Sequence, residues 1–182
     1  MKPIQFDNKA ARLIVTEELE RAKQLIINHI RINGQNASGR TIKSLHVEAT
    51  EDEGVLYGHK PFGILETGRK AGKIPYSFRS IIYQWMQDKG VHGIPIPYKG
   101  DGDHKWTPQE RGDLRMAGAI AYTIQHRGSR LHRIGGRDDV YSNVVPETLE
   151  RVRQRLISLI STEVSHIITA DKRESLNEKR GY

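Results

Sequence analysis

One stretch, residues 57–90, decides how this chain is organised: YGHKPFGILETGRKAGKIPYSFRSIIYQWMQDKG. Its first part, residues 62–68, is a short apolar turn that ends at a glycine. Its second part, residues 69–75, is a basic loop that contains glycine and is closed by Pro75. A basic loop held between two ordered apolar segments is suited to presenting its tip to another molecule.

The third part of the stretch predicts an amphipathic helix over residues 77–89. Ser77 can cap its N-terminus, and Gly90 follows as a stop signal. We expect the apolar residues at helical spacing to form its buried face, with Trp85 in the core. These residues are Ile81, Ile82, Trp85 and Met86.

Before this stretch, the sequence predicts a long helix, a helical turn and a hairpin. The long helix runs from Asn8 to Ile32, and one apolar stripe follows it: Val15, Leu19, Ala22, Ile26 and Ile30. A helical turn is expected over residues 38–45. Two short alternating segments, 46–50 and 55–58, are expected to pair across an acidic turn.

After the stretch, residues 91–107 are rich in glycine and proline and predict a loop. Thr107 and Pro108 mark a clean helix start, and small residues on this helix, ending near Arg127, allow another element to approach closely. Residues 128–143 predict a second basic loop. A last long helix is expected from Pro146 to Thr169. Its expected buried face carries Leu149, Val152, Leu156, Leu159, either Glu163 or Val164, and Ile167.

The sum is an α+β fold with two long terminal helices packed with a small antiparallel sheet and two inner helices, joined by long loops. We predict a single domain over residues 1–182. Residues 1–7 are expected to form an arm, residues 8–169 an α+β core with loop insertions at 91–107 and 128–143, and residues 170–182 a polar tail that frays or extends.

Composition limits the classes of function. The chain has no cysteine, which excludes disulfides, thiolate nucleophiles and cysteine metal sites. Its net charge is +7 and its pI about 9.7, which suits either a solvated basic surface or contact with a polyanion. A hydrophobic content of 36% indicates a modest core and much polar or interfacial surface. The N-terminus lacks a secretory pattern and no apolar run is long enough to span a membrane, so we expect synthesis in the cytosol without membrane contact.

The long loop holds the residues that most resemble a metal site: Asp101, Asp103 and His104, with His92 nearby in sequence. Metal ligands need a rigid supporting shell, and Asp-Gly-Asp is also ordinary turn chemistry, so the turn interpretation is preferred. The sequence has no His-Glu-x-x-His, phosphate-loop, nucleophile-elbow or dinucleotide-binding pattern. We therefore expect no enzymatic activity and no cofactor, and we keep a metal-dependent nuclease as the second alternative.

The two basic loops are the stronger signal. Their cations are Arg69, Lys70 and Lys73 in one loop and Arg127, Arg130, Arg133 and Arg137 in the other. The ordinary interpretation is a pair of solvated loops. However, both loops also carry large apolar residues, and arginine mixed with apolar anchors is typical of protein interfaces. These residues are Ile74 and Tyr76 in one loop and Leu131 and Ile134 in the other. Because few aromatic residues are available to stack bases, protein–protein contact is preferred over single-stranded nucleic acid.

Three motifs in order resemble one family. They are Ser38-Gly39-Arg40-Thr41-x-x-Ser44-Leu45, then Gly63-Ile64-Leu65-Glu66-Thr67-Gly68-Arg69, then Ala119-Ile120-Ala121-Tyr122-x-Ile124-x-x-x-Gly128-Ser129. The chain resembles the head–tail joining and minor tail (neck ring) proteins of tailed bacteriophages over residues 8–165, and it is similar to neck or tail ring proteins of crAss-like phages. It departs from the simplest members in its loops at 91–107 and 131–143.

The resemblance implies a structural virion protein that assembles in the host cytoplasm and forms a ring in the neck or tail connector. Its partners would be copies of itself, with twelvefold symmetry favoured over sixfold, together with portal, neck or tail proteins. We expect both basic loops to contact these partners. Lys70, Lys73, Arg130 and Arg133 are candidates to face DNA passing through the channel. The first alternative is a sequence-independent nucleic-acid-binding protein.

Overall fold

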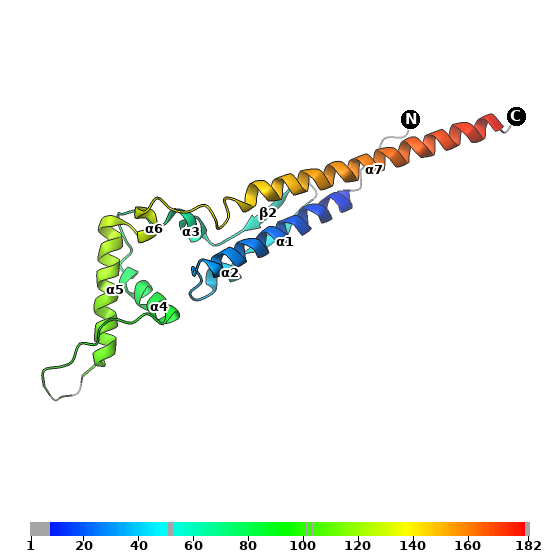
Figure 1. Cartoon of the computed structure of the whole chain (residues 1–182). Coiled ribbons are helices and arrows are strands. Elements are labelled where there is room, and N and C mark those ends of the chain that lie inside the picture. The colour runs from blue at the N-terminus through cyan, green and yellow to red at the C-terminus, as the bar shows by residue number, and fades with distance from the viewer. Residues whose placement is uncertain (1–7, 51–52, 101, 103, 181–182) are drawn as a thin grey trace. The chain divides into compact units, whose positions relative to one another are not determined.

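The computed structural model confirms the predicted α+β fold, with long helices near both ends, a two-stranded antiparallel sheet and two inner helices (Figure 1). The structure describes residues 8–50, 53–100, 102 and 104–180. The elements are α1 Asn8–Ile32, α2 Arg40–Lys43, β1 His46–Ala49, β2 Gly54–Tyr57, the 3-10 turn η1 Lys60–Gly63, α3 Ile64–Thr67, α4 Phe78–Lys89, α5 Pro108–Arg127, α6 Arg130–Arg133 and α7 Val144–Arg180.

Contacts within the chain divide it into two compact units, which we describe separately. The first unit contains residues 1–26, 45–57 and 142–182, and the second contains residues 27–44 and 58–141. The prediction of a single folding domain stays a prediction.

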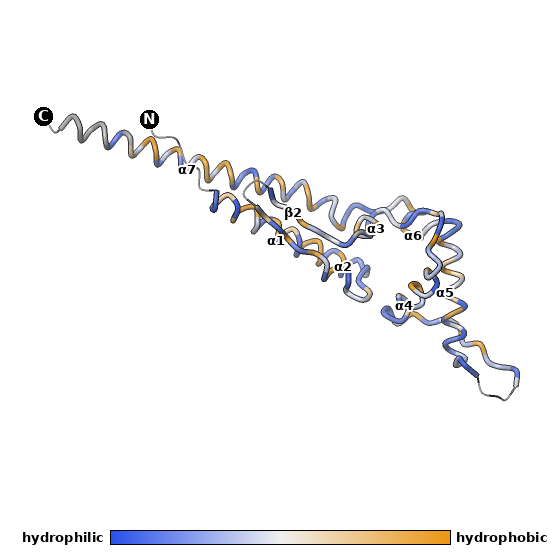
Figure 2. Tube along the Cα trace, turned by 180° about the vertical axis from the view of Figure 1, so that it is seen from behind, coloured by the Kyte–Doolittle hydropathy of each residue, from blue (hydrophilic) through white to orange (hydrophobic). Residues whose placement is uncertain are grey.

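In the first unit, α1 and α7 run antiparallel beside each other, as Figures 1 and 2 show from opposite sides. Glu18 is only 5% exposed and accepts hydrogen bonds from Arg151 at 3.0 Å and Arg155 at 2.9 Å. Burial raises the pKa of Glu18, but its two arginine partners outweigh burial and lower that pKa below its ordinary value. A buried carboxylate between two guanidinium groups therefore joins the two long helices.

The hairpin in the same unit has the predicted pairing, with His46 opposite Tyr57 and Ala49 opposite Gly54. It packs closely on α1, because a methyl group added at Gly54 would lie 2.3 Å from Cγ1 of Val15. Glycine at the start of β2 thus permits direct contact between the sheet backbone and the apolar stripe of α1.

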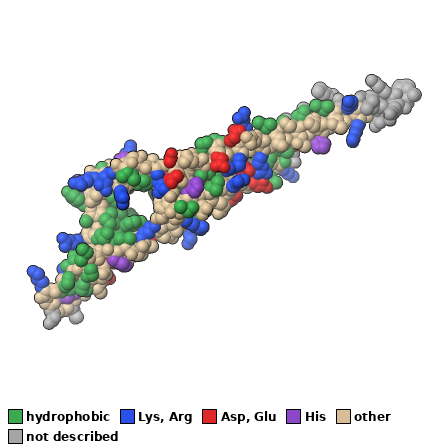
Figure 3. Space-filling view, in the orientation of Figure 1, with side chains coloured by type: hydrophobic (Ala, Val, Ile, Leu, Met, Phe, Trp, Pro, Cys, Tyr) green, Lys and Arg blue, Asp and Glu red, His purple; other side chains and the backbone are tan. Residues whose placement is uncertain are grey.

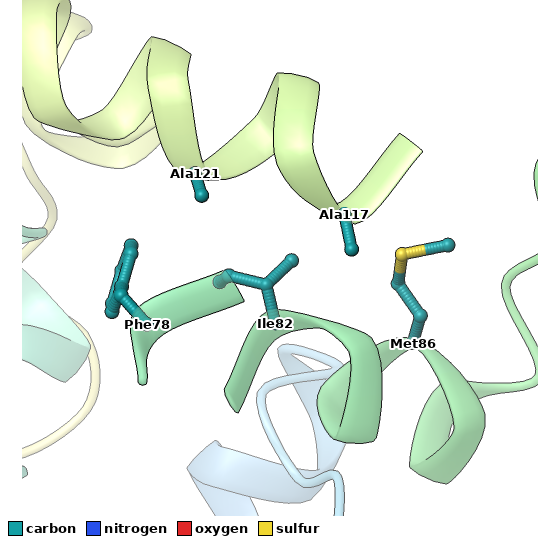
Figure 4. Packing of buried hydrophobic residues seen from close by; sticks show 5 residues of the cluster. All are labelled: Phe78, Ile82, Met86, Ala117 and Ala121. Atoms are coloured by element: carbon teal, nitrogen blue, oxygen red, sulfur yellow. The ribbon is translucent and has the colours of Figure 1, made fainter. Parts of the chain in front are cut away.

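In the second unit, α4 and α5 enclose the main apolar cluster. Phe78, Ile82 and Met86 recur every four residues on α4 and face Ala117 and Ala121 of α5 (Figure 4). The two alanines are 0% and 4% exposed, so small side chains let the helices approach closely, as predicted. The start of α5 is a complete capping box: Glu110 N–H donates to the Thr107 hydroxyl, and Thr107 N–H donates to the Glu110 carboxylate.

Asp113 fixes the long loop onto α5. Its carboxylate is buried and accepts hydrogen bonds from Gly93 N–H at 2.6 Å, Gln109 at 2.9 Å, and Gln87 and His92 at 3.2 Å. Burial raises the pKa of Asp113, but these four donors outweigh it and lower the pKa to about 2. The loop is therefore attached at its first residues by a charged acceptor.

Several expectations about helices are wrong. Ile81 is 47% exposed and Trp85 40%, so neither lies in the core, because α5 covers only the Phe78 face of α4 while both residues line an open groove of about 740 Å³. Leu149 is 65% exposed and Ile167 42%, whereas the fully buried residues of α7 are Val144 and Thr148. The other residues predicted on the buried face are half-buried: Val152, Leu156 and Leu159. The segment 170–180, expected to fray or extend, continues α7, since it contains no glycine or proline to end a helix. The helix also begins at Val144, two residues earlier than predicted.

The segment 128–143, predicted as a loop, contains one turn of helix, α6. Ser129 caps this turn by accepting a hydrogen bond from His132 N–H. Further along the segment, Val140 is 0% exposed. Much of this loop is therefore ordered and packed against the rest of its unit.

Candidate interaction surface

The two basic loops lie together and are joined by backbone hydrogen bonds. Ser129 N–H donates to Arg69 O at 2.8 Å, and Arg69 N–H donates in return to the Ser129 hydroxyl at 2.9 Å. A third bond runs from Gly72 N–H to Gln125 O at 2.8 Å. We call residues 69–76 and 127–137 the basic surface. The sequence predicted both parts of it but not that they form one feature.

Glycine is required where the two loops cross. Gly68 has a φ of +67°, and a Cβ there would lie 2.3 Å from the backbone nitrogen of His132. Gly128 has a φ of +77°, and its Cβ would lie 2.9 Å from Arg69 O. Both positions combine a left-handed backbone with a close approach that only glycine accommodates.

Glu66 holds the second loop in place. Its side chain is 3% exposed, and Oε1 accepts hydrogen bonds from Val140 N–H at 2.9 Å and Tyr141 N–H at 2.6 Å. Its backbone carbonyl accepts a further bond from Arg137 N–H at 2.9 Å. Burial raises the pKa of Tyr141, and the negative charge of Glu66 raises it further. One residue of the apolar turn thus fixes three backbone amides of the 128–143 segment.

The basic surface carries seven cations and no acidic residue, a local charge of +7 that equals the net charge of the whole chain. Two of the cations have partners within the second unit. The Arg69 guanidinium lies 4.9 Å from the centre of the Phe78 ring and donates to Lys73 O at 3.3 Å. Arg137 pairs with Asp139, which raises the pKa of Arg137 and lowers that of Asp139.

The other five cations have no ion-pair partner among the residues that the structure describes: Lys70, Lys73, Arg127, Arg130 and Arg133. All five are exposed. Figure 3 shows Lys and Arg side chains gathered over α6 and the adjoining end of α5. Unpaired cations on ordered backbone give this surface a fixed positive potential.

The apolar residues predicted as anchors divide into two kinds. Ile74 is half-buried against the α4–α5 cluster, and Leu131 is also half-buried, so both support the fold. Tyr76 is fully exposed, and Ile134 is 68% exposed. Only Tyr76 and Ile134 are therefore free to contact a partner with their whole side chains.

Of the residues considered as metal ligands, the structure describes His92 and His104. Asp101 and Asp103 lie outside the described residues. The His104 ring stacks on Tyr98 with centroids 3.3 Å apart. Among the residues whose placement is described, no group of three or more histidine, aspartate or glutamate side chains is arranged to hold a metal ion.

Comparison with known proteins does not add a family. No protein-family model, curated protein or solved structure matches the chain. Within the described part of the chain, no helix combines the length and apolar character needed to cross a membrane. The arguments about function therefore rest on the residues and their geometry.

Sequence reasoning missed three buried carboxylates that hold segments of the chain together. Glu66, Glu18 and Asp113 are buried carboxylates whose partners lie elsewhere in the chain. Asp113 does have a local signal, because it lies four residues after Gln109 on one helix face. Glu66 is flanked by Leu65 and Thr67 in an apolar turn, and a lone acid in such a run indicates an internal partner.

Proposed function

We propose that the chain is a structural subunit of a tailed-bacteriophage virion, forming a ring of identical copies in the neck or tail connector. The basic surface is the observation that supports this proposal. Its five unpaired cations stand on backbone fixed by Ser129, Glu66 and two glycines, next to the exposed Tyr76 and Ile134. An ordered, charged surface with aromatic and aliphatic edges is suited to docking on an acidic protein face.

A closed ring requires each subunit to present one face to a different face of its neighbour. In this proposal the basic surface is one of these two faces, and portal or tail proteins contact the same ring. No role as an enzyme and no cofactor is assigned. DNA passing through the ring would meet Lys70, Lys73, Arg130 and Arg133 without being read in sequence.

Mass photometry of the purified chain, alone and mixed with candidate portal and tail proteins, tests the proposal. We expect cyclic oligomers of more than two copies, and we expect the double variant Lys73→Glu, Arg130→Glu to lose them. The matched control is Arg12→Glu, Lys43→Glu, which makes the same change at two exposed cations outside the basic surface. A chain that stays monomeric under every mixture, or equal loss in the control, would overturn the proposal. Locating the chain in intact particles by cryo-EM tests the virion role directly.

The local charge of +7 also favours the alternative, a protein that binds nucleic acid without sequence preference. If all five unpaired cations contacted phosphates of duplex DNA, the logarithm of the binding constant would fall with the logarithm of the salt concentration with a slope of about −4.5. Titration of the isolated chain with duplexes of two unrelated sequences separates the alternatives. Micromolar binding with that salt dependence and no ring formation would favour the nucleic-acid-binding function.

A further inference from the structure

The last helix carries a second apolar seam. From residue 149 to residue 170, seven positions of α7 follow each other at alternating spacings of four and three, the spacing of a coiled-coil core. These positions are Leu149, Arg153, Leu156, Ile160, Glu163, Ile167 and Ala170. Figure 2 shows hydrophobic residues recurring along this helix. Five of the seven are apolar, and the two exceptions are one cation and one anion.

This seam is not the side of α7 that α1 covers. Arg151 and Arg155, which bind Glu18 of α1, occupy heptad positions outside the seam. On the seam itself, Leu149 is 65% exposed, Ile160 43% and Ile167 42%. Ile157 and Val164 flank the seam and are also exposed. Leu156 and Glu163 of the seam are half-buried, so the seam borders the side used within the first unit and is open along its outer edge.

We propose that this seam pairs with the same seam of a second copy, with the two helices antiparallel and the two-fold axis beside Ser158. In this register, a residue that lies a given number of positions before 158 faces the residue that lies the same number of positions after 158 in the second copy. Leu149 then faces Ile167 of the second copy, and Leu156 faces Ile160. Each of these contacts occurs twice, as in any two-fold interface.

The charged residues of the seam select this register. The same register places Arg153 opposite Glu163 of the second copy, so the two polar seam positions form two ion pairs. The Arg153 side chain is 71% exposed, and its contact with Glu150 is a long surface pair at 3.4 Å, which contributes little and is easily exchanged. A parallel pairing would instead bring Arg153 against Arg153 and Glu163 against Glu163. Like charges in a seam disfavour that orientation.

The size of the seam sets the expected strength. Its 22 residues span about 33 Å of helix. Burying the exposed part of its apolar side chains removes several hundred Å² per copy, the size at which an apolar patch marks a contact site, but less than the ~800 Å² per partner of a standard interface. We therefore expect a dimer with micromolar rather than nanomolar affinity. A two-fold contact ends at two copies, so this pairing is independent of the proposed ring.

Sedimentation equilibrium from about 1 to 100 micromolar tests the pairing, the range expected for an interface of this size. The parent chain is the full-length variant Lys73→Glu, Arg130→Glu, in which the proposed ring contact is removed. We expect a monomer–dimer equilibrium of this parent, with a dissociation constant that rises at least tenfold when Arg153→Glu or Glu163→Arg is added. With both charges exchanged, the dissociation constant should return to within about threefold of the parent. Arg21→Glu on α1 is the control, since it makes the same charge change at an exposed cation outside the seam. Far-UV circular dichroism establishes that each variant remains helical.

A parent chain that is monomeric throughout this range would overturn the proposal. A dimer that is insensitive to the single changes, or not rescued by the double change, would assign the contact to another surface. Failure of the ring leaves these outcomes unaffected, because Lys73 and Arg130 are not on α7.

Helix orientation has its own readout. The chain lacks cysteine, so Thr169→Cys provides a unique site for a spin label. In the antiparallel register, the two labels are separated by 22 residues along the helix, about 33 Å, whereas a parallel pair would place them roughly one helix spacing apart, about 10 Å. Pulsed electron resonance distinguishes these distances. The shorter distance would refute the antiparallel register.

Discussion

Removing the Glu66 carboxylate is the sharpest test of how the basic surface is built. The change is Glu66→Ala. It removes two hydrogen bonds from backbone amides to a charged acceptor, and the Val140 amide belongs to a residue that is 0% exposed. Each such bond contributes about 1.5–3 kcal/mol, and the Tyr141 amide is only partly buried, so water can replace part of its loss. We expect the free energy of unfolding to fall by about 3 kcal/mol.

Glu66→Gln separates the hydrogen bonds from the charge. The amide oxygen can still accept from both backbone N–H groups, so only the additional strength of a charged acceptor is lost, and the expected cost is about 1 kcal/mol. Glu48→Ala is the matched control, because the Glu48 side chain is 63% exposed on the hairpin.

Two measurements check the prediction. Urea denaturation gives the free energy of unfolding for each variant, and hydrogen exchange reports the amides of residues 137–141 directly. We expect these amides to lose protection in Glu66→Ala and to keep most of it in Glu66→Gln. Equal destabilisation by both changes would show that charge, and not hydrogen bonding, is what Glu66 supplies. A cost below about 0.5 kcal/mol for the alanine variant would refute its role altogether.

Three further predictions follow from single residues. Gly68→Ala should lower the free energy of unfolding by about 2 kcal/mol or more, because the position has a positive φ and the added Cβ would lie 2.3 Å from His132 N. Thermal denaturation measures this loss, with Gly100→Ala as the control because a Cβ there meets open space. The pKa of Asp113 is lowered to about 2 in the folded chain, so its stabilising contribution is complete above the ordinary value of 3.8 and is lost as the pH falls from there toward 2. In Asp113→Asn, the urea midpoint should therefore depend less on pH over this range than in the wild-type chain. Glu18→Gln should lower the free energy of unfolding by about 1–2 kcal/mol, because a buried charged acceptor is lost while Arg151 and Arg155 keep their pairs with Glu147 and Glu17. A loss in urea denaturation no larger than that of Glu48→Gln would contradict it.

Local signals in the sequence predicted much of the fold. The capping box at Thr107, the stop at Gly90 and the alternating hairpin segments all act over a few residues, and each is present in the structure. The small residues of α5 also predicted a close helix contact, which α4 makes. These features are determined by neighbours in the chain, so a single sequence is enough to find them.

Periodicity could not tell which apolar face of a helix is covered. The predicted face of α7 is only partly covered, since Val152, Leu156 and Leu159 are half-buried whereas Leu149 and Ile167 are exposed. The covered face carries Thr148 and two arginines, whose burial depends on Glu18, more than 130 residues away in the sequence. Trp85 shows the same effect, since the helix has a partner on only one side. Which face is buried is a property of the partner, and the partner is not encoded locally.

The candidate site was predicted as residue types and not as one surface. Arg69 and Arg137 resemble the other cations in sequence, but the structure engages them with Phe78 and Asp139. The two loops are joined by the Ser129 hydroxyl and by the backbone amides of Ser129 and Arg69. A pattern of charges in the sequence does not predict such bonds.

The positive surface is a consequence of how the second unit uses its carboxylates. Glu66 and Asp113 direct their charges inward, to backbone amides and glutamine side chains, where they order loops. Besides Asp139, the charge of Glu66 also raises the pKa of Arg137, but neither Glu66 nor Asp113 forms an ion pair with the five exposed cations of the basic surface. The five free cations therefore stay uncompensated although acids are present in the same unit, and their repulsion is a cost that a negatively charged partner would remove. If added polyanion did not raise the thermal stability of the chain, or raised it no more than that of the variant Lys73→Glu, Arg130→Glu, this repulsion would not be the feature that calls for a partner.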